Sequence, residues 1–260
     1  YIRGENSNLV IEFPETIDGI KVTKIVSKDN KFYDFRFIEK IKITKYINYI
    51  GTNPESGNIS DEPFLSCVSL VNIEVDSENE VFTSIEGVLY SKDLSTLISC
   101  PSNSITLDDG EYFIKEEVTT IGGYAFYSNK KLVTINLQDN LTNIGANAFY
   151  NCDLLTTINF GENSKVSQIG SAAFANCDSL KSVVLPNSLL QLNSIVFNNC
   201  KSLENVYIPA SVTTFGNDIF GASLKAVVTT SMDNLTFLRS KNDFLGIKNK
   251  DISTRIQGIE

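Results

Sequence analysis

Histidine is absent from all 260 residues of this sequence, and its absence limits the chemistry open to the protein. A chain without histidine cannot build a Ser-His-Asp or Cys-His catalytic centre, because each relies on an imidazole as its base. It also lacks the commonest ligand of zinc. Enzymes and metal sites of these classes are therefore excluded.

Basic residues are scarce relative to acidic ones. The sequence holds 22 Lys and Arg against 31 Asp and Glu, which gives a formal net charge of −9 at pH 7. Proteins that bind nucleic acids place clusters of positive charge against the phosphates, and no such cluster occurs along this chain. We therefore expect no nucleic-acid partner.

Long apolar runs are missing as well. The longest uncharged stretches, such as residues 97–107, are too short and too polar to span a bilayer, and the segment at Tyr1 does not resemble a signal peptide. Because the sequence begins without methionine, we expect any signal or anchor to lie outside these 260 residues. No membrane insertion is expected within them.

The strongest feature that is present is a repeat. Residues 144–185 contain one pattern twice, since Ile144-Gly145 returns as Ile169-Gly170. Starting from Ile121, the position of this pair recurs after 23, 25, 23 and 23 residues, with Leu192 and Phe215 in place of isoleucine in the last two coils. A fixed period of this length is typical of a solenoid, in which each coil buries its apolar side against its neighbours. A phenylalanine keeps the same period, at Phe126, Phe149, Phe174, Phe197 and Phe220.

The repeat predicts an α/β solenoid that is rich in strands, with short helical or irregular return limbs and about seven coils of 23–25 residues. Residues 1–260 are expected to form a single repeat domain. Its predicted segments are an N-terminal cap or degenerate repeat (1–24), two irregular repeats (25–75), a β-hairpin insertion (76–117), five regular repeats (118–230) and a helical C-terminal cap (231–260). The second irregular repeat contains a predicted surface insertion at 53–61.

Each coil contains a short segment that predicts one β-strand. Val183 and Leu185 alternate with Ser182 and Val184, the period of two expected for a strand with one buried face. Gly216, on a return limb, is expected to permit a tight corner. One strand per coil would form a parallel sheet, whose outward side chains we expect on a concave face. These candidate binding residues are Thr134, Asn136, Gln138, Thr157, Asn159, Ser182, Val184, Asn205 and Tyr207.

Two segments depart from the repeat. Residues 84–101 combine two apolar segments around a polar turn at 91–96, which predicts a β-hairpin that projects from the solenoid. After Val227 the period stops, and Ser231 as N-cap predicts a short helix over 231–245 that covers the last coil.

Four of the five cysteines occupy one position of the repeat: Cys67, Cys152, Cys177 and Cys200. We expect free interior thiols, because an unpaired cysteine packs as a small hydrophobic group. A disulfide framework is the alternative, but the odd count and the lack of paired spacing argue against it. Cys100 lies outside this column, beside Pro101.

The repeat unit resembles a known family. The pattern IGxxAFxxCxxLxxIxLPxxLxx, clearest at residues 169–191, is similar to the BspA-like leucine-rich repeat family, and segment 84–101 resembles an insertion common in that family. Segment 113–126 resembles its usual return to the repeat, with Lys115 where proline is more typical. Departures are Leu192-Asn193 in place of Ile-Gly and Asn129 in place of cysteine, besides a two-residue deletion after Phe220.

The resemblance covers residues 9–230 and implies a leucine-rich repeat solenoid. It also implies a bacterial or protist protein that is extracellular or exposed on the cell surface, and some members of the family adhere to host matrix proteins or to other cells. No catalytic residue, metal ligand or cofactor comes with the family. Because fold alone does not determine function, the ligand has to be argued from the residues.

The candidate binding residues are polar and almost uncharged, which favours a protein or glycan partner over a charged ligand. The leading hypothesis is non-catalytic recognition or adhesion by a monomer, through the concave strand face or the hairpin. Tyr207, an aromatic residue with a hydroxyl group, is the expected anchor. One alternative is a structural spacer that presents another module and binds no ligand. A second is that these residues only keep the strands soluble.

Two acidic runs, residues 76–80 and 108–111, offer oxygen atoms that calcium could use. Neither has the spacing of a dedicated calcium loop, so we expect solvated loops and no cofactor. Glycoside hydrolysis needs two carboxylates held across a cleft, whereas Asp and Glu are scattered here. The protein is therefore expected not to be an enzyme.

Overall fold

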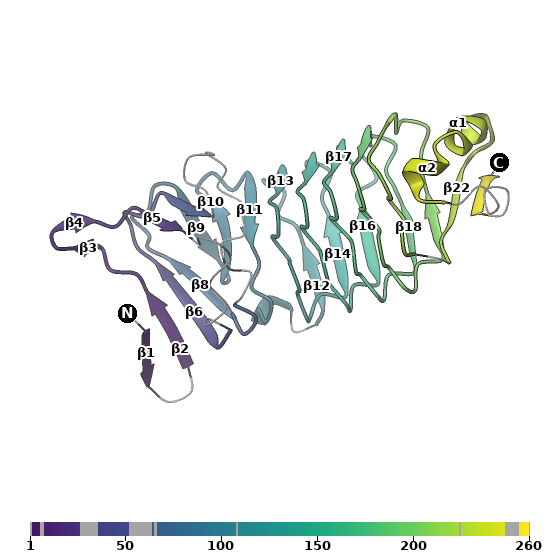
Figure 1. Cartoon of the computed structure of the whole chain (residues 1–260). Coiled ribbons are helices and arrows are strands. Elements are labelled where there is room, and N and C mark those ends of the chain that lie inside the picture. The colour runs from purple at the N-terminus through teal and green to yellow at the C-terminus, as the bar shows by residue number, and fades with distance from the viewer. Residues whose placement is uncertain are drawn as a thin grey trace.

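The chain forms an elongated stack of coils. The structure is a computed structural model, and it describes residues 2–5, 8–26, 36–51, 64, 67–107, 109–223, 225–247 and 255–259. In Figure 1 the coils follow one another from the N-terminal to the C-terminal end, and the two termini lie at opposite ends of the stack. The strand-rich solenoid that the repeat predicts is therefore confirmed.

One side of the stack, which we call the strand face, carries three sheets. The first contains β1 (Ile2–Glu5), β2 (Asn8–Glu12), β6 (Ile38–Ile43) and β8 (Asn72–Val75). The second contains β12 (Glu111–Phe113), β14 (Thr134–Leu137) and β16 (Thr157–Phe160). The third contains β18 (Ser182–Val184), β20 (Asn205–Tyr207), β22 (Val227–Ser231) and β23 (Ile256–Ile259). Apart from the antiparallel pair β1 and β2, the neighbouring strands are parallel.

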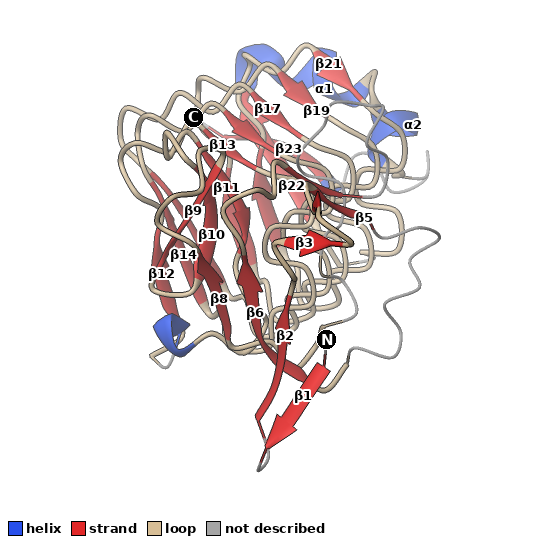
Figure 2. Cartoon of the chain, turned by 90° about the vertical axis from the view of Figure 1, so that its left-hand side faces the viewer, coloured by secondary structure: helices blue, strands red, loops and turns tan. Residues whose placement is uncertain are grey.

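An eight-stranded sheet runs along another side of the stack, as the view along the stack in Figure 2 shows. Its strands are β9 (Phe82–Ile85), β10 (Val88–Ser91), β11 (Thr96–Ser99), β13 (Thr120–Ile121), β15 (Asn143–Ile144), β17 (Gln168–Ile169), β19 (Gln191–Leu192) and β21 (Thr214–Phe215). Smaller elements are β5 (Lys24–Val26), which pairs with β7 (Tyr49–Gly51), and the 3-10 helix η3 (Ile105–Leu107).

The hairpin predicted at 84–101 does not project. β10 pairs antiparallel with β9 and β11, and β11 continues in parallel with β13, so the hairpin belongs to the eight-stranded sheet. Val88 and Leu97 pack in the core of the regular coils, whereas Leu89 and Ile98 pack in a second core at the N-terminal end. The predicted projection is wrong because both faces of these strands carry apolar side chains, and both faces are buried against a core.

A different hairpin does protrude. β3 (Thr16–Ile17) and β4 (Ile20–Lys21) extend away from the N-terminal end of the stack in Figure 1. Asp18 and Gly19 make its turn with positive φ angles of 51° and 78°. This is the Asp-Gly pair that two-residue hairpin turns favour.

Glycine allows successive coils to approach each other closely. A β-carbon on Gly145 would lie 2.5 Å from the backbone nitrogen of Gly123, and one on Gly170 would lie 2.5 Å from that of Ala146. Gly216 approaches the backbone of Ser194 in the same way. The prediction that Gly216 permits a tight corner is wrong, because its φ angle is not positive. Glycine is needed there because the backbone of the preceding coil lies too close for a β-carbon. The corners instead use positive φ at Tyr124, Ser128, Asn147, Asn151, Ala172, Asn176, Ile195, Asn199 and Asp218.

Phenylalanine rings form a continuous column inside the regular coils. The ring centroids of Phe126 and Phe149 lie 4.9 Å apart, those of Phe149 and Phe174 lie 5.0 Å apart, and the rings are nearly parallel. The column continues to Phe197 and Phe220 at spacings of 5.7 and 5.8 Å. All five rings are fully buried, so each coil packs its aromatic ring on that of the next.

The cysteine column lies beside these rings. Cys67, Cys152, Cys177 and Cys200 are buried and free, which confirms the predicted interior thiols. The last three donate to the carbonyl oxygen of the phenylalanine in the preceding coil, over 3.0, 3.2 and 3.1 Å. In the following coil the Ser223 hydroxyl makes the same bond over 2.5 Å. In these four coils the position thus holds a small side chain that donates a hydrogen bond to the preceding coil.

Short helices and one further strand lie at the C-terminal end. In place of the single helix predicted over 231–245, the chain forms η4 (Met232–Asn234), α1 (Leu235–Arg239) and α2 (Asn242–Leu245), and Ser231 makes no side-chain capping bond. Leu238 and Leu245 pack in the core of the regular coils. β23 then adds to β22, and Arg239 donates two hydrogen bonds, of 3.2 and 3.0 Å, to the carbonyl oxygen of Ile256.

The segment boundaries taken from the sequence stay predictions. The surface insertion predicted at 53–61 lies outside the described residues. Within the described part of the chain, no helix has the length and apolar character that crossing a membrane requires.

Truncation of one ring in the phenylalanine column should be strongly destabilising. Phe174→Ala removes a fully buried ring that stacks on Phe149 and Phe197, and the coils on either side cannot collapse into the space. We expect the free energy of unfolding to fall by about 3–5 kcal/mol. Urea denaturation followed by circular dichroism measures this change, and an unchanged midpoint would show that the ring is not part of the core.

The buried thiols should make the fold sensitive to alkaline pH. Burial raises the pKa of Cys152 and of Cys200 from an ordinary 9.0 to about 12, and it also raises the pKa of Cys177. The folded protein thus keeps protons that the unfolded chain releases above about pH 9. The stability is complete below that pH and is lost towards pH 12, by about 1.4 kcal/mol per thiol for each pH unit.

Urea denaturation at several pH values between about 8 and 11 measures this dependence. A variant with alanine at all three positions serves as the control and should have a shallower slope. Equal slopes for the two proteins would contradict the role of the thiols.

Candidate functional site

The nine candidate binding residues lie together on the outer side of the strand face. Eight are in β14, β16, β18 and β20 at outward positions of the strands, and Gln138 directly follows β14. The register places Asn136 beside Asn159 and Val184 beside Tyr207. None of the nine is buried. The structure therefore brings these residues to one surface.

Side-chain amides form a ladder across the second sheet. The Asn159 amide donates to the Asn136 side-chain oxygen over 2.8 Å, and the Asn136 amide donates to the Glu111 carboxylate over 2.8 Å. These bonds orient both amides along the sheet. Asn159 ends the ladder, so its own side-chain oxygen remains available as an acceptor.

The strand face is interrupted where the ladder ends, between β16 and β18, which belong to different sheets. At the equivalent position of neighbouring coils, the amide of Thr156 donates to Val133 over 2.9 Å and the amide of Glu204 donates to Lys181 over 2.9 Å. Among the described residues, no such bond joins the Lys181 amide to Thr156. The interruption coincides with the one coil of 25 residues.

The same two coils stay in contact on their other sides. β17 pairs with both β15 and β19 in the eight-stranded sheet, and the Phe149 and Phe174 rings remain stacked. The Cys177 thiol still donates to the carbonyl oxygen of Phe149. The coils are therefore closed on the core side and open on the strand face.

A groove of about 570 Å³ occupies this opening. Ile158 and Phe160 form part of its wall and are half-buried, whereas their equivalents in the other regular coils are fully buried. Val184, with 68 % of its surface exposed, lies on the rim. The polar residues that line the groove are Thr156, Thr157, Asn159, Glu162, Ser164, Ser182, Asn187, Ser188 and Tyr207. We call this feature the strand-face groove.

Five of the nine candidate residues line the strand-face groove: Thr157, Asn159, Ser182, Val184 and Tyr207. The other four lie beside it on β14, just after β14, and on β20. The apolar wall was missed, because Ile158 and Phe160 occupy positions that are buried in every other regular coil. Two extra residues near Glu162 and Asn163 are the signal in the sequence that could have indicated it.

Phe113 is another residue that the sequence analysis missed. It lies on β12 beside Asn136, on the outer side of the strand face, and 60 % of its surface is exposed. Alignment of residues 111–114 with the strand segment at 134–137 would have assigned Phe113 to this surface.

The chemistry of the strand-face groove suits binding better than catalysis. Its described lining has one titratable carboxyl group, that of Glu162, besides the phenol of Tyr207. The serine and threonine hydroxyls have no basic side chain among the lining residues that could activate them as nucleophiles. The groove can therefore offer hydrogen bonds and an apolar wall to a ligand.

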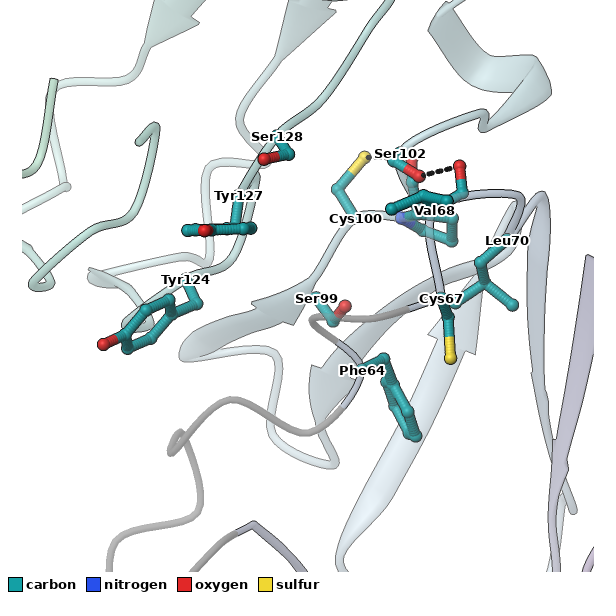
Figure 3. Close-up of a pocket in the computed structure, with 11 residues that line it drawn as sticks. Phe64, Cys67, Val68, Leu70, Ser99, Cys100, Ser102, Tyr124, Tyr127 and Ser128 are labelled. Carbon is teal, nitrogen blue, oxygen red and sulfur yellow. Dashed lines mark hydrogen bonds between the residues drawn. The ribbon is translucent and has the colours of Figure 1, made fainter. Parts of the chain in front are cut away.

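A second hollow lies where the hairpin meets the regular coils. It is lined by Phe64 and Cys67 on one side and by Tyr124 and Tyr127 on the other, as Figure 3 shows. The Ser102 hydroxyl donates to the carbonyl oxygen of Val68 over 2.8 Å along its wall. Its volume of about 30 Å³ is close to that of a single water molecule, so it is too small for an organic ligand.

The acidic run at 76–80 has a structural role. Asn79 is buried and donates to the carbonyl oxygens of Thr44 and Ile47, while its own oxygen accepts from the amides of Val81 and Phe82. Glu78 pairs with Lys45 over 2.8 Å. No cluster of acidic and cysteine side chains suited to a metal ion occurs among the described residues. Asp108, in the second acidic run, lies outside the described residues.

The open side of the long coil should be visible in amide exchange. The Lys181 amide lacks the bond to the preceding coil that protects the amides of Thr156 and Glu204. We expect the Lys181 amide to exchange with solvent at least roughly tenfold faster than those two. Hydrogen exchange followed by NMR measures the three rates, and equal protection would show that the strand face is continuous.

Comparison with known proteins identifies the repeat. The pattern of the BspA type leucine rich repeat region matches residues 109–226, in six copies. A search of the curated proteins gives no match. Among solved structures, a leucine-rich repeat protein from Eubacterium ventriosum is 26 % identical with a TM-score of 0.69, and the match covers 86 % of this chain and 55 % of that one.

Two further structures share the fold. A leucine rich cell surface protein from Faecalibacterium prausnitzii is 24 % identical with a TM-score of 0.67, over 90 % of this chain and 62 % of that one. The pneumococcal vaccine antigen PcpA is 21 % identical with a TM-score of 0.66, and the match covers 94 % of this chain and 72 % of that one. The chain thus spans little more than half of the Eubacterium protein. Residues 109–226 are thus BspA type leucine-rich repeats, and the chain has the fold of a leucine-rich repeat protein.

Proposed function

We propose that this protein is a non-catalytic recognition module, exposed on the cell surface or secreted, and that the strand-face groove holds its ligand. The observation that carries the proposal is the groove itself, which has a polar rim with a single carboxyl group, that of Glu162, around an apolar wall. Ligand sites commonly combine a concave, mostly apolar surface with a few polar groups that orient the ligand.

The location at the cell surface is supported by two proteins with the same fold. One is described as a cell surface protein and the other as a vaccine antigen, although their identity to this chain is below 25 %. A partner on host matrix or on another cell would be consistent with that location. We propose that the protein acts as a monomer, because one copy of the chain provides the whole groove.

The hairpin is not proposed as a binding surface. Val88, Leu89, Tyr90, Leu97 and Ile98 are all buried, so the strands that the sequence analysis considered for contact are part of the core. Tyr207 remains the proposed anchor of the ligand, because its ring lies at the groove and carries a hydroxyl group.

An array of matrix proteins and oligosaccharides tests this function. The intact protein should bind at least one component, and the double variant Asn159→Ala with Tyr207→Ala should bind it roughly tenfold more weakly or not at all. Thr214→Ala, an exposed position on β21 in the other sheet, is the matched control and should bind as the unaltered protein does.

Each result of the array has a distinct meaning. Equal binding by the double variant and the control would exclude the strand-face groove as the site. Absence of binding by the unaltered protein to every component would favour the structural spacer. Thermal unfolding of the variants should match that of the unaltered protein, since none of the substituted side chains is buried.

A further inference from the structure

We infer that the ligand of the strand-face groove is a neutral oligosaccharide. This inference rests on the proposed function and adds the chemical class of the ligand.

The hydrogen-bonding groups of the groove match those of a sugar. Thr157 and Ser182 supply hydroxyl groups, and Asn159 and Asn187 supply amides, so each residue can both donate and accept. Sugar hydroxyls also donate and accept at the same oxygen atom. Ser188 donates to the carbonyl oxygen of Val166 over 2.8 Å, which leaves its oxygen as an acceptor. The rim can therefore both accept a hydrogen bond from a sugar hydroxyl and donate one to it.

The charge of the groove argues against acidic ligands. No lysine or arginine occurs among its described lining residues, and Glu162 places one carboxylate at its edge. Carboxylates, sulfates and phosphates are bound through Arg or Lys in most protein sites. The formal net charge of −9 adds a repulsive field at longer range. A sialylated or sulfated glycan would therefore be disfavoured relative to a neutral one.

The apolar part of the groove fits the C–H faces of sugar rings. Val184 and Tyr207 are neighbours in register on β18 and β20, so an aliphatic and an aromatic surface lie side by side. Ile158 and Phe160 add further apolar surface to the groove. Aromatic rings with a polar tip are well suited to a ligand that has an apolar face and a hydroxylated edge.

The extent of the groove suits more than one sugar ring. It reaches from β16 across β18 to Tyr207 on β20, which is at least two strand spacings of about 4.8 Å each. The volume of about 570 Å³ lies within the range of pockets that bind small organic ligands. A short oligosaccharide lying across the strands fills this space better than a monosaccharide.

A glycan array of matched neutral and sialylated oligosaccharides tests the inference with the intact protein. We expect binding to neutral glycans only, with less than about a twofold change in Kd between about 50 and about 500 mM NaCl. In titration calorimetry with the best neutral glycan, Tyr207→Ala should weaken binding roughly tenfold or more. Tyr207→Phe should retain it within about threefold, because the ring is kept. Thr214→Ala is again the control.

The outcomes separate this inference from the proposed function. If a matrix protein binds and Tyr207→Ala abolishes that binding while no glycan binds, the sugar ligand is excluded and the recognition function stands. A preference for sialylated glycans, or strong weakening by salt, would overturn the assignment of a neutral ligand. If neither glycans nor matrix proteins bind, both proposals fail.

Discussion

The close approach of successive coils is the constraint on which the rest of the structure depends. Gly145 and Gly170 lie against the backbone of the coil before them with no space for a β-carbon. At this separation each phenylalanine stacks on the next, and each cysteine thiol reaches the carbonyl oxygen of the preceding coil. The aromatic column, the thiol column and the eight-stranded sheet are thus three results of one spacing between coils.

This constraint explains where the strand-face groove lies. Two additional residues cannot enter the coil on its core side, because the glycine, phenylalanine and cysteine positions are already in contact there. They enter instead on the strand face, where they separate β16 from β18.

The sequence predicts the features that every coil repeats, and it fails where a feature depends on one particular neighbour. The period identified the phenylalanine and cysteine columns and the outward positions such as Asn159, because each is a local property of the coil. The sequence predicts that the hairpin at 84–101 lies outside the stack, since its strands lack the period of the repeat. In the structure its two faces are buried against two separate cores. The apolar wall was unpredictable for a similar reason, because Ile158 is half-buried only in the coil that carries the two extra residues.

The charge distribution along the strand face separates the groove from the N-terminal strands. On β6 and β8, Lys40 pairs with Glu74 over 2.7 Å, and Lys42 lies 4.0 Å from Glu12 of β2. Side chains held in such pairs are already satisfied by each other, and ligands would have to displace them. The strands around the groove carry amides, hydroxyls and Tyr207 instead. One solenoid thus presents a self-paired charged surface on its N-terminal strands and a hydrogen-bonding surface of amides and hydroxyls around the groove.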